Sequence, residues 1–178
     1  CRRSLRRICD ASGDGSRLHP WPDLDFSSLG QKRTRIDGAH NRGITLPQLR
    51  KLLEFIVRHA DEKGLLVGWW DRSKYARGEA LNKATINLYA VADWIIKPFT
   101  AKEACSFVEL VVDEGTVAQP PQWFVSHWWG EPVRDFVVSV EVHARARGVE
   151  EKAAAYWVCA YANNQHELGT DIAMDPRQ

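Results

Sequence analysis

Seven polar or aromatic side chains follow two tryptophan-rich runs, and their chemistry suits ligand binding. They are Ser126, His127 and Trp128 after the first run, and Asn163, Asn164, Gln165 and His166 after the second. A hydroxyl and an imidazole can orient a substrate, and amides both donate and accept hydrogen bonds, which suits a nucleobase, a ribose or a peptide backbone. An indole can stack on a ring-bearing ligand. We therefore predict that these seven residues bind a ligand.

The same residues give no catalytic assignment. Ser126 and His127 are neighbours in a predicted strand, so their side chains point to opposite faces and cannot readily act as a nucleophile and its base. The chain has no G-x-S-x-G turn of the α/β-hydrolase type. No metal is predicted, because the histidines lack the close spacing typical of zinc ligands. The alternative role is structural, with hydrogen bonds inside the local turns and Trp128 packed against the next helix.

Hydrophobic patterning places the two groups at one edge of a sheet. The first run predicts a strand that begins near Gln122, and the second predicts a strand over 155–161. Between them, Gly130-Glu-Pro132 predicts the start of a helix and Gly148 predicts its end. Strand, helix and strand in this order are typical of a parallel βαβ unit, in which ligands bind beyond the carboxyl ends of the strands.

Three helices are predicted upstream of this unit, over residues 46–62, 81–97 and 101–113. Apolar residues recur at helical spacing in each of them. Between the first two lies the apolar run Leu65–Trp70, for which a strand and a buried turn are equally compatible with the sequence. These helices can cover one side of the parallel sheet.

Capping residues support the predicted helix boundaries. Thr45 with Gln48 matches a capping box at the start of the first helix, and Thr100 with Glu103 matches another at the start of the third. Pro98 is predicted to stop the second helix, because proline lacks the backbone N–H that a helix interior needs.

Charge and composition divide the chain into three segments. Residues 1–43 hold nine Lys and Arg against five Asp and Glu, a net of +4, and predict an irregular basic arm. Residues 44–118 form a predicted helical leader region, and residues 119–178 contain the βαβ unit. The whole chain has a net charge of +1, so nucleic acid is not expected as its partner. A basic arm can contact nucleic acid, but a solvated arm is the preferred interpretation.

The cysteines and the apolar content predict a cytoplasmic protein with no membrane span. Cys1, Cys9, Cys105 and Cys159 show no CxxC spacing and predict reduced thiols. No stretch approaches the roughly 20 apolar residues that a membrane-spanning helix needs. The chain begins with cysteine and its only methionine is Met174, so we interpret it as a fragment.

Two segments resemble a large family of algal and protist proteins. They are residues 123–130, with an F-V-S-H-x-W strand, and residues 156–166, with a W-V-x-x-x-x-N-x-Q strand end. That family in turn resembles a divergent branch of the Toll/interleukin-1 receptor (TIR) domains. The resemblance implies an α/β fold with a flavodoxin-like parallel sheet, of which residues 119–178 would be the first half, truncated at the C-terminus.

The resemblance also implies two alternative functions. TIR domains assemble with other protein domains, including copies of themselves, as signalling scaffolds, and this is the preferred expectation. Other TIR domains cleave NAD, which makes a nucleotide a possible ligand and NAD a possible substrate rather than a resident cofactor. Those members use a glutamate in a later segment, so the alternative is a nucleotide-processing hydrolase whose catalytic glutamate lies beyond residue 178. Whether the chain is an enzyme stays open at this point.

Overall fold

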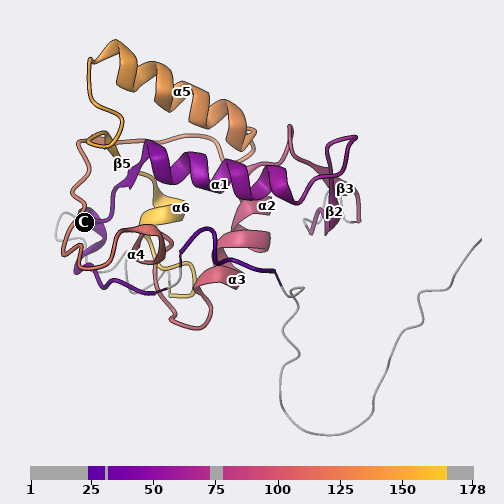
Figure 1. Ribbon diagram of the computed structural model, residues 1–178, viewed down its shortest axis with the longest axis horizontal. Coiled ribbons are helices and arrows are strands. Elements are labelled where there is room, and N and C mark those ends of the chain that lie inside the picture. Colours follow the sequence, from indigo (N-terminus) through magenta and orange to yellow (C-terminus); the bar gives the residue numbers. More distant parts are fainter. Residues whose placement is uncertain (1–23, 31, 73–77, 168–178) are drawn as a thin grey trace, which may run out of the picture.

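A small mixed sheet forms the centre of the molecule in the computed structural model, which describes residues 24–30, 32–72 and 78–167. Its three strands are β1 (Ile44–Thr45), β5 (Ala155–Trp157) and β4 (Trp123–Phe124), in the order β1-β5-β4. β5 pairs with β4 in parallel and with β1 in antiparallel register. The chain is therefore an α/β protein (Figure 1).

The predicted parallel βαβ unit is confirmed. Strands β4 and β5 pair through Trp123 with Tyr156 and through Phe124 with Trp157. Helix α5 (Val133–Ala146) connects them and buries the apolar stripe that the sequence shows. Its N-cap is Pro132, whose fixed backbone angle suits the first turn of a helix.

The first predicted helix is also confirmed, as α1 (Leu46–Arg58), although it ends at Arg58 rather than at residue 62. It begins with the expected capping box, in which the backbone N–H of Thr45 donates to Oε1 of Gln48 at 2.9 Å. Leu49, Leu52 and Phe55 are fully buried on one side of the helix. Helix α1 packs against α5, and Figure 1 shows the two lying along each other over one side of the sheet.

The run Leu65–Trp70 is a strand, β2, and it pairs with β3 (Ala80–Asn82) as an antiparallel hairpin. This hairpin is a separate two-stranded sheet at the C-terminal end of α1 (Figure 1). The backbone N–H of Val67 donates to the carbonyl of His59 at 3.0 Å, which fixes the hairpin to the end of that helix.

The helix predicted over 81–97 starts later and ends later than expected. Residues 80–82 belong to β3, and helical structure runs from Leu88 to Thr100 as α2 (Leu88–Val91), a π-helix (Ala92–Ile96) and α3 (Lys97–Thr100). The start is set by Asn87, whose side chain accepts from the backbone N–H of Ala90 at 3.1 Å. Pro98 does not stop the helix. Proline cannot donate a backbone hydrogen bond, and the wider π-helical turn directly before it changes the spacing of these bonds, so the helix continues.

The helix predicted over 101–113 is wrong in its start and length. Residues 101–104 form a turn, and the helix is only α4 (Val108–Val111). Thr100 does not cap it, because its hydroxyl donates to the carbonyl of Ile96 at 2.7 Å inside α3. The reciprocal capping bonds form later, from Ser106 N to Glu109 Oε2 at 3.0 Å and from Glu109 N to Ser106 Oγ at 3.4 Å.

The strand predicted over 155–161 is shorter than expected. It ends at Trp157, and α6 (Cys159–Ala162) follows directly. Tyr161 therefore lies in a helix, fully buried, with its ring centroid 5.5 Å from that of Phe107. Burial against α4 explains the apolar character of residues 158–162 that the sequence analysis interpreted as a longer strand.

The three predicted segments contribute to one core. In the first segment, Leu29 and Ile36 are buried and Phe26 stacks on Phe55 at 5.4 Å between ring centroids. In the second, strand β1 pairs with β5 of the third. The predicted boundary between residues 118 and 119 therefore separates β1 from β4 and β5, although these three strands belong to one sheet.

Candidate functional site

Side-chain exposure alternates along the extended segment 122–129, which contains the first group of predicted site residues. The exposed side carries Phe124, Ser126 and Trp128, whereas His127 lies on the half-buried side. The imidazole of His127 stacks on the ring of Phe136 with 4.3 Å between centroids. Burial lowers the pKa of His127, and the carboxylate of Glu131 offsets this in part. Ser126 and His127 thus face opposite ways, and the structure does not join them as a catalytic pair.

The second group of predicted site residues lies against α3 and the turn that follows it. Asn163 and Asn164 are buried, and Asn164 Nδ2 donates to the carbonyl of Ala104 at 2.8 Å. Gln165 Nε2 donates to the carbonyls of Cys159 at 3.3 Å and Ala160 at 3.2 Å, the first two residues of α6. Asn164 and Gln165 thus donate to backbone carbonyls, Asn164 to a distant turn and Gln165 within its own segment, which is a structural role.

His166 completes the second group. Its Nε2 lies 2.9 Å from Oγ1 of Thr100, and its backbone N–H donates to Oδ1 of Asn164 at 3.0 Å. Burial lowers the pKa of His166, and the positive charge of Lys97 lowers it further. Among the described residues, no hydrogen bond or ring contact joins this group to residues 126–128.

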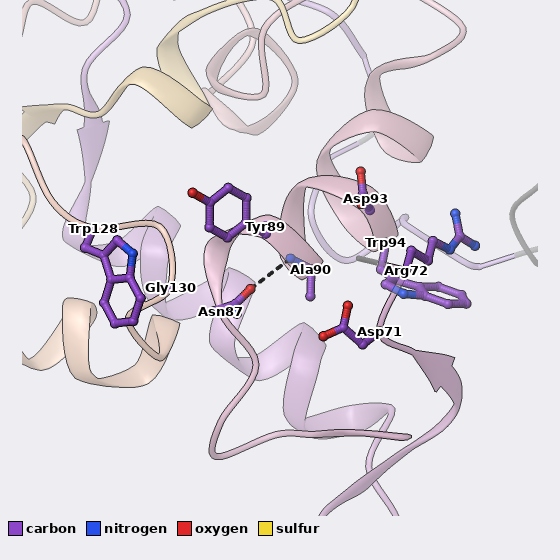
Figure 2. Close-up of a pocket in the computed structure, with 9 residues that line it drawn as sticks. All are labelled: Asp71, Arg72, Asn87, Tyr89, Ala90, Asp93, Trp94, Trp128 and Gly130. Carbon is purple, nitrogen blue, oxygen red and sulfur yellow. Dashed lines mark hydrogen bonds between the residues drawn. The ribbon is translucent and has the colours of Figure 1, made fainter. Parts of the chain in front are cut away.

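A cavity of about 330 Å³ opens beside Trp128, at a place that the sequence analysis did not predict (Figure 2). It is lined by side chains from three parts of the chain. They are Asp71 and Arg72 after β2; Asn87, Tyr89, Ala90, Asp93 and Trp94 in and before the helical stretch 88–100; and Trp128 and Gly130 after β4. Of the seven predicted ligand-binding residues, Trp128 lines this cavity.

Backbone hydrogen bonds fix the loop that carries Trp128 against the start of α2. The N–H of Leu88 donates to the carbonyl of Trp129 at 3.0 Å, and the N–H of Val133 donates to that of Ile86 at 2.9 Å. The ring of Trp128 also folds back over Gly130, where an added Cβ would lie only 2.3 Å from Cζ2 of the indole. Glycine at position 130 therefore allows the observed orientation of Trp128.

Arg72 forms the opposite wall of the cavity from Trp128 (Figure 2). Its guanidinium carbon lies 4.0 Å from the ring centroid of Trp94, a cation–π contact. Trp94 is buried, stacks on Trp69 with 5.4 Å between centroids, and donates its indole N–H to the carbonyl of Trp70 at 2.9 Å. Burial lowers the pKa of Arg72 and Asp93 raises it in part, yet a guanidinium stays charged at neutral pH.

Two carboxylates contribute negative charge to the cavity. Asp93 pairs with Lys97, with 2.7 Å between Oδ1 and Nζ. Asp71 follows β2, and Figure 2 shows its carboxylate on the same side of the helix as Asn87 and Ala90. The described lining residues include no serine, cysteine or histidine. The cavity therefore offers aromatic and charged contacts for binding, without the nucleophile and base of a serine or cysteine enzyme.

The sequence held one usable signal for this cavity. Asn87 directly precedes the apolar run of the helix, and asparagine is a preferred N-cap residue. A helix start at Leu88 would have placed Asn87 and Tyr89 at an exposed helix end. The approach of Asp71 and Arg72 depends on the β2–β3 hairpin, whose position the sequence does not encode locally.

Comparison of the chain with protein-family models, with curated proteins and with solved structures found no match. Within the described ranges, no group of three or more His, Cys, Asp or Glu side chains is placed to hold a metal ion. No helix of the described residues combines the length and apolarity that crossing a membrane requires.

Proposed function

We propose that this chain is a protein-interaction domain that acts in signalling assembly, with other protein domains or further copies of itself as partners. The observation that carries the proposal is a set of exposed aromatic side chains, which we call the aromatic face. Phe124 and Trp128 lie on the exposed side of segment 122–129, and Tyr89 lines the cavity with Trp128. Their side chains are 71%, 74% and 55% exposed. Large aromatic side chains dominate the binding energy of protein interfaces, and exposing them to water in an isolated protein is unfavourable.

The aromatic face is held in place before any partner arrives. The ring of Tyr89 lies 5.4 Å from that of Trp129, and Phe124 stacks on Trp157 with 4.8 Å between centroids and 16° between ring planes. Trp128 is placed by its contact with Gly130. Side chains that are already ordered lose little conformational entropy on binding, which favours association.

We also propose the finer fold that the TIR resemblance implies, a flavodoxin-like sheet that begins with β4, α5 and β5. Its support is the parallel pairing of β4 with β5 across a helical connection. Within the described residues, β4 pairs with β5 on one side only, which leaves an edge where a further strand can pair.

A cytoplasmic location belongs to the same proposal. Cys105 and Cys159 are both free thiols. Burial raises the pKa of Cys105 to about 12, so this thiol stays protonated and unreactive at neutral pH. Unpaired, unreactive thiols are typical of proteins in a reducing compartment.

Sedimentation velocity over a range of protein concentrations tests the proposed assembly. We expect the average mass to rise with concentration. Trp128→Ser should weaken association by about thirtyfold, because an aromatic hot-spot side chain contributes about 2 kcal/mol or more. The matched control is Val117→Ser, since Val117 is 85% exposed but lies outside the aromatic face, and this variant should associate like the parent. A protein that stays monomeric up to about 1 mM, where association would be no stronger than about −4 kcal/mol, would contradict self-assembly.

The hydrolase alternative is separated by a second measurement. The measurement uses the folded protein extended past residue 178, so that the glutamate expected for the hydrolase is included, and incubation with NAD should release no nicotinamide if the chain is an interaction domain. Release that disappears in His127→Ala, with the circular dichroism spectrum unchanged, would favour the hydrolase and return the site to the ends of β4 and β5. His127 suits this test because it belongs to the predicted site at the strand ends. It lies on the half-buried side of its segment and does not line the cavity beside Trp128.

A further inference from the structure

We propose that the cavity beside Trp128 binds a proline-rich segment of a partner protein. This inference rests on the proposed function and names the class of partner. It is carried by the end of the cavity that lies away from Arg72, where Trp128, Tyr89 and Asn87 are found (Figure 2). This end combines two exposed aromatic rings with hydrogen-bond donors that are not used inside the chain.

Charge does not select the ligand of this cavity, because its charged side chains already have contacts within the chain. Asp93 pairs with Lys97, with 2.7 Å between Oδ1 and Nζ. Arg72 lies over the ring of Trp94, and Asp71 also has an interaction of its own. The negative charges of Asp71 and Asp93 are balanced by the positive charges of Arg72 and Lys97. We therefore expect an uncharged ligand that is held by aromatic rings and neutral polar groups.

The neutral polar groups at this end of the cavity are hydrogen-bond donors. Oδ1 of Asn87 accepts from the backbone N–H of Ala90 at 3.1 Å, so the Nδ2 atom of Asn87 remains to donate. The indole N–H of Trp128 can only donate, and the phenol of Tyr89 can donate its proton. Within the ranges that the structure describes, none of these three donors has a hydrogen-bond partner. They therefore suit a ligand that presents acceptors.

A proline-rich segment presents acceptors and few donors. Proline has no backbone N–H, so the carbonyl oxygens of such a segment outnumber its N–H groups. An ordinary extended peptide or a sugar also brings N–H or O–H donors, for which these three groups offer little. The chemistry of the donors therefore favours proline over other uncharged ligands.

The aromatic rings provide the packing surface. Trp128 and Tyr89 both line the cavity, and both are more than half exposed. Proline-rich segments dock in aromatic-lined grooves as a polyproline II helix, which is largely formed before binding and therefore loses little entropy. The cavity, at about 330 Å³, is at the small end of the range for organic ligands, which is about 300–1,000 Å³. This size suits about one turn of such a helix, which is three residues.

The test is an NMR titration of the ¹⁵N-labelled whole chain, which observes the indole N–H signal of Trp128, assigned from Trp128→Phe. The probes are N-acetyl-hexaproline amide and N-acetyl-(Gly-Ser)₃ amide, which has the same length but is flexible. We expect a saturable shift with hexaproline, and binding of the Gly-Ser peptide that is weaker by about tenfold or more. Equal binding of the two peptides would overturn the preference for proline. A Trp128 signal that does not move up to about 10 mM hexaproline would overturn the site.

Asn87→Asp tests one donor directly. Aspartate keeps the oxygen that accepts from Ala90 but has no N–H, so we expect hexaproline to bind about fivefold more weakly. The matched control is Asn82→Asp, which adds the same charge and should bind like the parent. Asn82 Oδ1 likewise accepts from a backbone N–H, that of Ala84 at 2.7 Å, but Asn82 does not line the cavity. Unchanged affinity in Asn87→Asp would overturn the assignment of Asn87 as a donor to the ligand.

Tyr89→Leu is the second variant, and it serves if Asn87→Asp changes the circular dichroism spectrum. It removes an exposed ring and its hydroxyl, so hexaproline should bind about tenfold more weakly. Unchanged affinity in Tyr89→Leu would overturn the aromatic packing surface.

The two proposals can fail separately. If hexaproline leaves the Trp128 signal unchanged while the protein still associates through the aromatic face, only the proline site is overturned. If hexaproline binds but the protein stays monomeric, self-assembly is overturned and the cavity keeps its assignment. If neither occurs, both are overturned.

Discussion

At the scale of single residues, Glu109 is a buried ionisable group held by several hydrogen bonds and two arginines. Its buried carboxylate accepts hydrogen bonds from Arg33 Nη2 at 3.0 Å, Ser106 N and Oγ at 3.0 Å, and Ile36 N at 3.3 Å, and Arg42 Nε lies 3.8 Å away. Burial alone would raise the pKa of Glu109. The Ser106 backbone hydrogen bond and the charges of Arg42 and Arg33 outweigh it, so the pKa lies below its ordinary value.

We predict that Glu109→Gln destabilises the protein by about 3 kcal/mol. Removal of one partner from a buried ion pair leaves the arginines without their countercharge, and such changes cost about 3–5 kcal/mol. The measurement is urea unfolding followed by circular dichroism. The control Glu114→Gln removes an exposed carboxylate that pairs with Lys32, and should change stability little. A Glu109→Gln variant as stable as the parent would show that the carboxylate is not needed.

The same group gives a predicted pH dependence. The pKa of Glu109 is lower in the folded protein than in the unfolded chain, where glutamate has a pKa of about 4.3. The unfolded chain therefore binds the proton more readily at acid pH. The stability that Glu109 contributes is fully present above that pH and is lost as pH falls through the folded-state pKa. Unfolding curves between pH 7 and pH 3 should lose stability less steeply in Glu109→Gln than in the parent.

Gly130 provides a further prediction at this scale. Gly130→Ala places a Cβ within 2.3 Å of the Trp128 ring, which must turn away. We expect the indole signal of Trp128 to shift and self-association to weaken, with little loss of stability because the displaced ring is exposed. Unchanged association in this variant would show that the orientation of Trp128 does not matter to the aromatic face.

The residue scale is also where the sequence predicts least about the site. Trp128 was found because its type and its place after a strand are local signals. Asp71, Arg72 and Tyr89 reach the cavity only through the packing of a hairpin and a helix. The amides of Asn164 and Gln165 are suited to a ligand by type, but side-chain type alone does not tell whether the partner is a ligand or a backbone carbonyl.

At the scale of elements, sequence patterns predicted those whose signals lie within a few residues. Helix α1 has a capping box and a buried stripe, and the β4-α5-β5 unit has two apolar runs around an amphipathic helix. Prediction failed where two local signals competed. Thr100 and Ser106 are both residue types that cap helices. The helix begins after Ser106, because the Glu109 carboxylate that accepts from Ser106 N is buried beside cations.

The capping box of α1 can be tested directly. We predict that Thr45→Ala is less stable than Thr45→Ser by about 1 kcal/mol. Both variants lose the same methyl group, but only serine keeps the hydroxyl that accepts from the third residue of the helix. Thermal or urea unfolding of the two variants measures the difference. Equal stability would mean that the bond from Thr45 N to Gln48 Oε1 is sufficient to cap the helix.

At the scale of the whole molecule, the described residues unite the three predicted segments in one core. Ile36 is fully buried, although it lies in an irregular stretch that the sequence predicted to be a solvated arm. Composition could not predict this, because the stretch has few apolar residues and no periodicity. Within residues 24–43, the core uses Leu29 and Ile36, and Leu24 and Phe26 pack against it.

We therefore predict that the protein unfolds in one cooperative transition. Curves recorded by tryptophan fluorescence and by circular dichroism should coincide, because β1 and β5 come from segments on either side of residue 118 and pair with each other. Ile36→Ala should shift both curves together, by about 2–5 kcal/mol. The exposed neighbour in Arg35→Ala serves as the control and should leave both nearly unchanged. Two separate transitions would contradict a single core.

The stacked indoles of Trp69 and Trp94 have a consequence for how the molecule absorbs and emits light. Their rings are 4° from parallel with 5.4 Å between centroids, close enough for their electronic transitions to couple. Emission from this buried pair should lie at short wavelength, whereas Trp128, the most exposed of the described tryptophans, should emit at long wavelength. The two ends of the fluorescence spectrum thus report on different places, so a partner protein that covers Trp128 can be followed at the red edge while the blue edge monitors whether the Trp69–Trp94 pair stays packed.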